Sequence, residues 1–169
     1  MRASGSLVGQ NNVRFSGGAN RNTAPLTSAQ QQDVLDYAKV LGTDADNIRF
    51  YSYDAPSNYS DLLDTVFVGP DIYPGTGVTS SVVDRLSMKA TLAHEVVGHR
   101  YSTLAGRDFA PGSYLDEFQA SYRAARLAPD LNSTERFQLL KDSVRRLHSE
   151  NITVKQFKQS DDFTRLYLD

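Results

Sequence analysis

One stretch, LAHEVVGHR at positions 92–100, constrains the fold more than any other part of the sequence. It holds two of the three histidines, His94 and His99, and places Glu95 directly after the first. The two histidines stand at i and i+5, and five residues at about 100° each leave two side chains about 140° apart on an ideal α-helix. An undistorted helix therefore directs the two imidazoles away from each other. If both serve one site, the helix must contain a π-type turn, which Gly98 accommodates most easily because it lacks a Cβ.

The residue types in this stretch point to a metal. In the closely related pattern H-E-x-x-H, two imidazoles on one helical face hold zinc and the glutamate acts as a general base. The sequence has no cysteine, so a metal must be bound by imidazole and carboxylate groups. We therefore expect a Zn²⁺ site with His94 and His99 as ligands and Glu95 as base. The alternative is a chance occurrence of a motif with only three fixed positions.

A catalytic zinc site generally has a third protein ligand and one open position. The next predicted helix, over residues 113–128, begins with the letters SYLDE. Its S-x-x-D pattern assigns Asp116 to a capping box, turned back toward the backbone, which leaves Glu117 to point elsewhere. Glu117 is therefore the first choice for the third ligand, Asp116 the second and Asp108 the third.

The remaining pattern predicts a small α+β domain, in which a twisted sheet packs on the metal-binding helix and a helical C-terminal part follows. A length of 169 residues with 40% hydrophobic residues suits one such core. Capping signals and apolar periodicity predict helices over residues 27–41, 87–104, 113–128 and 132–147 and a last one from residue 153, and alternation predicts strands over residues 47–53 and 65–73.

Two features refine this organisation. Residues 1–24 are rich in Gly, Ser and Asn and show no sustained period, so we interpret them as a linker or arm attached to a domain over residues 25–169.

Pro70 has no backbone N–H to donate to a neighbouring strand, so the second predicted strand is expected at an edge of the sheet, where an extended peptide could pair with it.

The net charge of −2 gives no sign of the excess of basic residues with which proteins bind nucleic acid or an anionic membrane. No apolar run approaches the length of a membrane span. We therefore expect neither of these as a partner.

The motifs resemble those of the gluzincin metallopeptidases, which combine a histidine-glutamate helix with a glutamate on a following helix. HEVVGH is similar to the HExxGH motif of the dipeptidyl peptidase III family, whose acidic ligand lies in a motif similar to residues 116–120, DEFQA. The chain is far shorter than that two-domain enzyme, so its exopeptidase specificity is not implied. The run over residues 93–129 also resembles metallopeptidase toxin domains at the C-termini of polymorphic (RHS-type) bacterial toxins. That resemblance implies a delivered toxin acting in a target cell, with a cognate immunity protein as partner.

Together these features predict a zinc peptidase, most simply an endopeptidase acting on a protein or peptide, with Glu95 passing a proton from water to the leaving amine. The oxyanion would need a donor. Tyr114 is the catalytic candidate, and the other donors in reach of the motifs are Tyr101, Arg123 and His148. Ser121 could orient a ligand or simply pack in its helix. The alternatives are a zinc hydrolase of a non-peptide amide or ester, and an inert binding domain.

Overall fold

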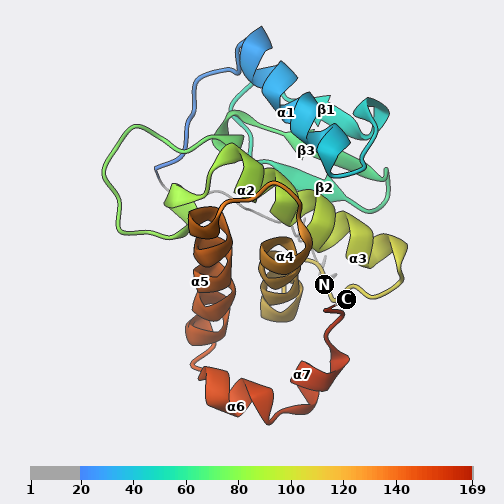
Figure 1. Cartoon of the computed structure of the whole chain (residues 1–169), viewed down its shortest axis with the longest axis vertical. Helices are drawn as coiled ribbons and strands as arrows, with labels where there is room; N and C mark the ends of the chain where they lie inside the picture. Colours follow the sequence, from blue (N-terminus) through green and yellow to red (C-terminus); the bar gives the residue numbers. More distant parts are fainter. Residues whose placement is uncertain (1–19, 169) are drawn as a thin grey trace, which may run out of the picture.

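The computed structural model describes residues 20–168, which form a three-stranded sheet and a set of helices around one central helix (Figure 1). The central helix, here called the motif helix, comprises α2 (Met88–Ala93), the π-helical segment η4 (His94–Arg100) and α3 (Tyr101–Leu104). The other helices are α1 (Ser28–Val40), α4 (Tyr114–Leu127), α5 (Ser133–Ser149), α6 (Val154–Lys158) and α7 (Asp161–Arg165). The strands are β1 (Ile48–Phe50), β2 (Asn58–Ser60) and β3 (Thr65–Val68), and short 3₁₀ turns are η1 (Ala45–Asn47), η2 (Pro70–Ile72) and η3 (Val83–Arg85).

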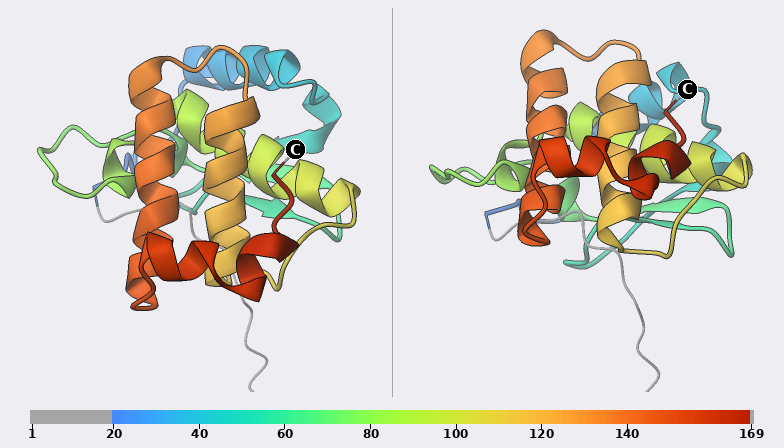
Figure 2. Two further views of the ribbon diagram at one scale, coloured as in Figure 1. Left: turned by 60° about the horizontal axis from the view of Figure 1, so that its bottom comes forward. Right: turned by 90° about the horizontal axis from the view of Figure 1, so that it is seen from below.

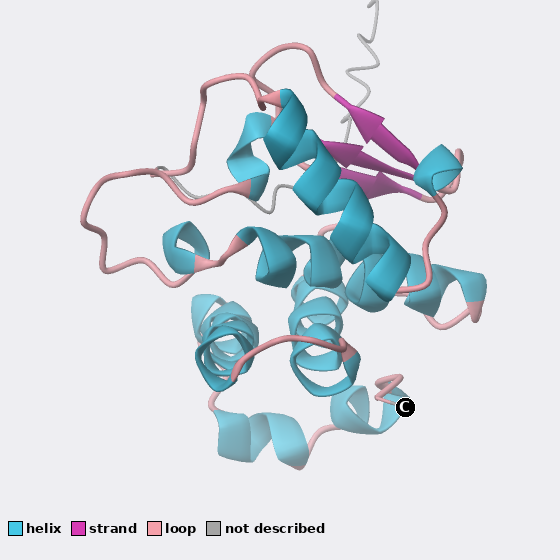
Figure 3. Ribbon diagram, turned by 45° about the horizontal axis from the view of Figure 1, so that its top comes forward, coloured by secondary structure: helices cyan, strands magenta, loops and turns pink. Residues whose placement is uncertain are grey.

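The sheet and α1 cover one side of the motif helix, and α4 and α5 lie on the other side (Figure 3). This arrangement confirms the predicted α+β class, with a small sheet packed on the motif helix and a helical C-terminal part. The layers form because every element has one apolar face that must be buried.

The order of the strands corrects one prediction. β3 was expected at an edge, but the order is β1-β3-β2, with β1 parallel and β2 antiparallel to the central β3. Pro70 does not interrupt the ladder because β3 ends before it, and Pro70 occupies the first turn of η2, where its missing N–H is not needed. β2 has three residues within a segment that the sequence presents as a polar turn, so it was not predicted.

The helix starts follow the sequence closely. As the capping patterns predict, a polar side chain at the start of each of these helices accepts a hydrogen bond from the third following backbone N–H. The capping residues are Thr27, Ser87, Ser113, Asn132 and Thr153. These caps fix where the motif helix and α4 begin, and therefore which of their residues face each other.

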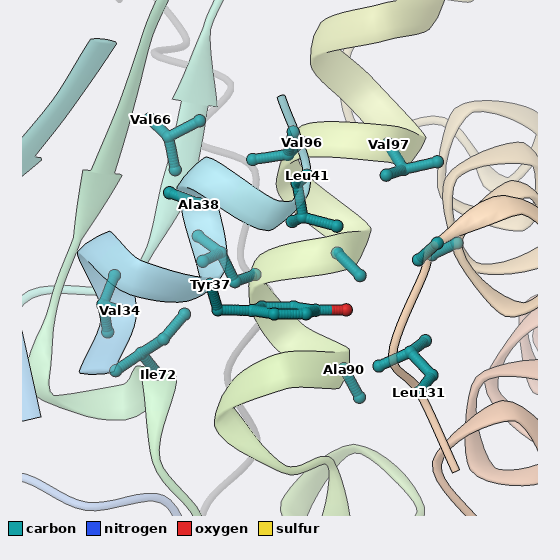
Figure 4. Close-up of a cluster of buried hydrophobic side chains, with 14 of the residues drawn as sticks. Val34, Tyr37, Ala38, Leu41, Val66, Ile72, Ala90, Val96, Val97 and Leu131 are labelled. Carbon is teal, nitrogen blue, oxygen red and sulfur yellow. The ribbon is translucent and has the colours of Figure 1, made fainter. Parts of the chain in front are cut away.

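The main core joins α1, the sheet and the motif helix (Figure 4). Val34, Val66 and Val96 are fully buried there, and each such side chain contributes roughly 1.5–3 kcal/mol. Figure 4 shows Val96 directed toward the strands and Tyr37 crossing the motif helix toward the segment after α4. The Tyr37 hydroxyl donates to the carbonyl of Pro129 at 2.8 Å, which ties α1 to the end of α4.

A second apolar cluster joins the C-terminal helices. α6 and α7 cross the ends of α4 and α5, which run side by side (Figure 2). The cluster contains Leu115, Phe118, Leu147, Phe157 and Leu166. In the part of the chain from residue 20 to residue 168, no helix has both the length and the apolar character needed to cross a membrane.

Residues 1–19 of the predicted arm lie outside the described residues. Its last part, residues 20–24, packs against the domain because Arg21 is buried and donates to backbone carbonyls. Its Nε lies 2.7 Å from the carbonyl oxygen of Asp71, and its Nη1 lies 2.6 Å from that of Leu86. Burial lowers the pKa of Arg21 to about 10, but the guanidinium remains charged at neutral pH.

Candidate metal centre

The two motif histidines meet because the helix between them is a π-helix. η4 spans His94–Arg100, and the backbone N–H of Tyr101 bonds to the carbonyl of Val96, five residues back. With this wider turn, the Nε2 atoms of His94 and His99 lie 3.1 Å apart, and the two rings are nearly perpendicular at 83°. The predicted local widening is confirmed, and it extends over the whole motif.

Gly98 lies in this π-helix, as predicted, but for a different reason. Its φ is not in the left-handed region, so relief of backbone strain does not explain the glycine. Instead, a Cβ at this position would lie 2.6 Å from the Cα of Ala120 and 2.7 Å from its Cβ. Gly98 therefore permits the close approach of α4 to the motif helix, which brings the acidic residues of α4 to the histidines.

Glu117, in the first turn of α4, completes the group. Its Oε2 lies 3.3 Å from His94 Nε2, and its Oε1 lies 3.8 Å from His99 Nε2. One ligand atom from each of the three residues fits within 4.8 Å, and all three residues are buried. His94, His99 and Glu117 thus form a buried group that could hold a metal ion.

The two other acidic candidates have different positions. Asp116 is buried behind His99, with its Oδ1 3.5 Å from Nδ1, the ring nitrogen that does not face the group. Its Oδ2 accepts from the backbone N–H of Gly112 at 3.1 Å, so it turns back to the chain ahead of α4 as predicted, although it also contacts a candidate ligand. Asp108 is exposed in the loop before α4.

The charges of the group shift the pKa values of its members in opposite directions. Burial acts to lower the pKa of His99, but the contact with Asp116 and the negative charges of Glu117, Asp116 and Glu95 outweigh it and raise the pKa. Burial acts to raise the pKa of Glu117, but His94, His99 and Arg146 outweigh it and hold the pKa well below its ordinary value. The His99 imidazole and the Glu117 carboxylate thus each favour the charged form of the other.

Ser121 lies behind His94, one turn after Glu117 in α4. Its hydroxyl oxygen is 2.9 Å from His94 Nδ1, and the hydroxyl donates to Asp142 Oδ2 at 2.7 Å. Ser121 and Asp142 are both fully buried. Of its two interpretations, orienting a ligand or packing in the helix, the contact favours the first.

Two residues of α5 that belong to this site were not predicted. Asp142 accepts from Ser121, and Arg146 places its Nη2 3.2 Å from Glu117 Oε2 and its Nε 3.4 Å from Asp142 Oδ2. The signal available in the sequence was their spacing, since i and i+4 share one helical face with the buried Leu139 and Ser143. The apolar spacing of Phe137, Leu140, Val144 and Leu147 predicts a different buried face for this helix; Leu147 is buried, but Phe137 and Leu140 are exposed.

Glu95 is buried next to His94, and its carboxylate is one of the charges that raise the pKa of His99. Tyr114 lies at the start of α4, where its hydroxyl donates to Asp162 of α7 at 2.6 Å. Burial, together with this bond, raises the pKa of Tyr114 to about 12. Its catalytic role stays a prediction.

The other predicted donors are engaged away from the group. The Tyr101 hydroxyl donates to the carbonyl of Leu41, Arg123 donates to the carbonyls of Val97 and Tyr167, and His148 is exposed on α5.

Comparison of the chain with protein families, with curated proteins and with solved structures finds no match.

Proposed function

We propose that the chain is a zinc-dependent peptidase that cleaves internal peptide bonds, with His94, His99 and Glu117 holding the metal and Glu95 acting as general base. The observation that carries this proposal is the π-helix. It brings together two imidazoles that a regular helix would separate, on the face that meets a carboxylate from α4.

The donor set favours zinc. Two imidazole nitrogens and one carboxylate oxygen are a known catalytic set for Zn²⁺, and the chain offers no thiolate. Asp116 contacts Nδ1 of His99 and not the nitrogen that faces the group, so it does not supply a fourth ligand. Three ligands leave one position open. Zinc, when bound, supplies a Lewis acid that acidifies water and polarises a carbonyl group.

The reaction requires a proton to move as the peptide bond breaks. In this proposal Glu95 accepts a proton from the attacking water and donates it to the amine nitrogen as the carbon–nitrogen bond breaks. The water oxygen forms the new bond to the carbonyl carbon as its proton moves to Glu95, and the carbon–nitrogen bond breaks afterwards. Glu95 follows His94 directly in the sequence, and its negative charge is one of those that raise the pKa of His99, which supports its assignment as the base beside the metal.

The biological setting of the proposal rests on the resemblance of residues 93–129 to toxin metallopeptidases. By that resemblance, the chain would be a delivered effector domain. Its substrate would be a protein of the target cell, and its natural partner would be a cognate immunity protein.

One observation favours a second function, in which the metal stabilises the fold and takes no part in catalysis. The four residues His94, Glu95, His99 and Glu117 are each at most 4% exposed, and such burial is also expected of a structural metal site. A non-peptide amide or ester remains an alternative substrate class, because the ligand set selects the chemistry of the water and not the substrate.

The test compares the wild type with Glu95→Gln. Both proteins should purify with one zinc per chain by elemental analysis, and only the wild type should generate new protein termini in the proteome of cells that express it. A wild type without zinc after reconstitution would refute the metal site. If both proteins bind zinc and generate the same set of new termini, the peptidase activity would be refuted and the stabilising role of the metal would remain.

A further inference from the structure

We propose that Asp142, acting through Ser121, fixes the tautomer of His94 so that the lone pair of Nε2 faces the metal position before a metal arrives. This inference rests on the proposed function, because it treats Nε2 of His94 as a metal ligand. Asp142 and Ser121 are then positioning residues, contributed by α5 and α4 respectively.

The direction of the hydrogen bonds carries the proposal. The carboxylate of Asp142 can only accept, so the single hydroxyl proton of Ser121 is donated to its Oδ2, 2.7 Å away. Toward His94 Nδ1, at 2.9 Å, the same oxygen can then only accept. Nδ1 must therefore carry the proton, and in a neutral imidazole this leaves a lone pair on Nε2.

The surroundings of Asp142 keep it an acceptor. Although burial favours the neutral acid, Arg146 and the hydrogen bond from Ser121 are among the groups that hold the pKa of Asp142 below its ordinary value. Arg145 also donates to its Oδ1, at 2.9 Å from Nη2 and 3.1 Å from Nε. With both carboxylate oxygens engaged, the acceptor toward Ser121 is fixed in place.

The crevice beside this relay, lined by Leu86, Thr91, His94, Asp142 and Arg146, is too narrow to hold a water molecule. The fully buried side chains of Ser121 and Asp142 therefore supply the hydrogen bond that Nδ1 of His94 makes in the described structure.

The second histidine has a carboxylate in the equivalent place. Asp116 contacts Nδ1 of His99 directly, at 3.5 Å, whereas Asp142 acts on His94 through a hydroxyl. Both rings thus have a carboxylate on the Nδ1 side and the shared group on the Nε2 side. A hydrogen bond on the far nitrogen is what sets the orientation and tautomer of a ligating imidazole.

The first experiment needs no metal. Long-range ¹H–¹⁵N correlation spectra of the metal-free wild type, recorded at increasing pH until the ¹⁵N shifts of His94 are those of a neutral imidazole, report which nitrogen of His94 carries the proton. We expect protonation at Nδ1. In Ser121→Ala, which removes the acceptor but suits a helix, the population should shift toward Nε2–H. A wild-type His94 protonated at Nε2 would overturn the proposal.

The second experiment measures zinc affinity by competition with a chromophoric chelator. Ser121→Ala should bind zinc about 10- to 100-fold more weakly than the wild type. The matched control is Ser143→Ala, because Ser143 is equally buried but donates to the carbonyl of Leu140, outside the relay. The control should match the wild type in both tautomer and affinity.

The outcomes separate the two proposals. Equal zinc affinity for Ser121→Ala and wild type would overturn the positioning role, as would an equal loss in Ser143→Ala, which would indicate a general effect of packing. A wild type that shows the Nδ1–H tautomer but binds no zinc would refute the proposed function, while the tautomer assignment would stand.

Discussion

The motif helix has two sides that are stabilised by different interactions. Toward the sheet and α1 it presents apolar side chains, and Val96 packs there with Val34 and Val66 without polar contacts. Toward α4 and α5 it presents His94 and His99, which meet buried carboxylates and a guanidinium. The same element therefore supports the fold on one side and a charged centre on the other.

The difference shows where stability and function are separated. Burial of apolar groups is favourable in itself, whereas each buried charge costs several kcal/mol unless partners offset the cost. On the α4 and α5 side, the partners belong to the site itself. Substitutions there should therefore weaken metal binding and also cost stability where they leave a buried charge without a partner, whereas substitutions on the sheet side should affect stability alone.

The largest effect is expected where the two sides are joined, at Gly98. Gly98→Ala forces a Cβ to within 2.6 Å of the backbone of Ala120, so α4 must move away from the motif helix. We expect a net loss of about 3 kcal/mol of unfolding free energy, because the clash with the Ala120 backbone outweighs the roughly 1 kcal/mol that the better helix propensity of alanine contributes, together with weaker zinc binding. Thermal unfolding and chelator competition measure both.

The matched control for this substitution is Gly77→Ala. A Cβ at Gly77 meets no atom closer than 4.0 Å, so the melting temperature should stay within about 2 °C of the wild type. A Gly98→Ala protein that melts higher than the wild type would show that the contact with Ala120 does not restrict the approach of α4.

The second effect separates the ligand from its neighbour. Glu117→Gln should reduce zinc affinity by about 100-fold or more, since a neutral amide oxygen replaces the carboxylate. Asp116→Asn should reduce it by about 10-fold, because Asp116 contacts Nδ1 of His99 and not the nitrogen that faces the metal position. Isothermal titration of both metal-free variants measures the difference, and the reverse order would make Asp116 the ligand.

Much of the metal-ligand group could be predicted because it depends on local rules. The i and i+5 spacing of His94 and His99 required a wider turn, and the S-x-x-D pattern at Ser113 left Glu117 free to face them. The reason for Gly98 could not be predicted, because it depends on Ala120 of another helix.

The contributions of α5 could not be predicted from local periodicity. Apolar spacing assigned Phe137 and Leu140 to its buried face, but the helix turns Leu139 and Asp142 inward instead. A buried aspartate is favourable only with partners such as Ser121 and two arginines, and those contacts are tertiary. The edge position expected for β3 was wrong for a similar reason, since the short β2 is recognisable only by its pairing.

A smaller effect is expected on the apolar side. Val96→Ala removes two methyl groups from the fully buried contact with the strands, which should cost about 2 kcal/mol of unfolding free energy. Zinc affinity should remain within about threefold of the wild type, because the π-helix and its polar contacts are unchanged. Urea denaturation and chelator competition test this, and a tenfold loss of affinity would contradict the separation of the two sides.

The smallest effect concerns pH and distinguishes the metal-free protein from the zinc-loaded one. In the metal-free protein the raised pKa of His99 stabilises the fold below its ordinary value of 6.5, and this contribution is lost as pH rises through the folded-state pKa. The lowered pKa of Glu117 stabilises the fold above its ordinary value of 4.5, and that contribution is lost as pH falls toward the folded-state pKa. The metal-free protein should therefore be most stable between these two ordinary values.

Zinc reverses the upper part of this profile. A metal can bind Nε2 of His99 only when that nitrogen has lost its proton. Because the pKa of His99 is raised, protons compete with zinc up to a higher pH. Zinc affinity should therefore fall by up to about tenfold for each unit of pH below the folded-state pKa. Zinc-loaded protein should accordingly gain melting temperature as pH rises from 5 to about 8, while metal-free protein should lose it above about 6.5. Calorimetric scans with and without zinc would show the two curves diverging with pH. Valine carries no titratable group, so Val96→Ala should shift both curves down by the same amount between pH 5 and pH 8, and a pH-dependent shift would show that the two sides of the motif helix are coupled.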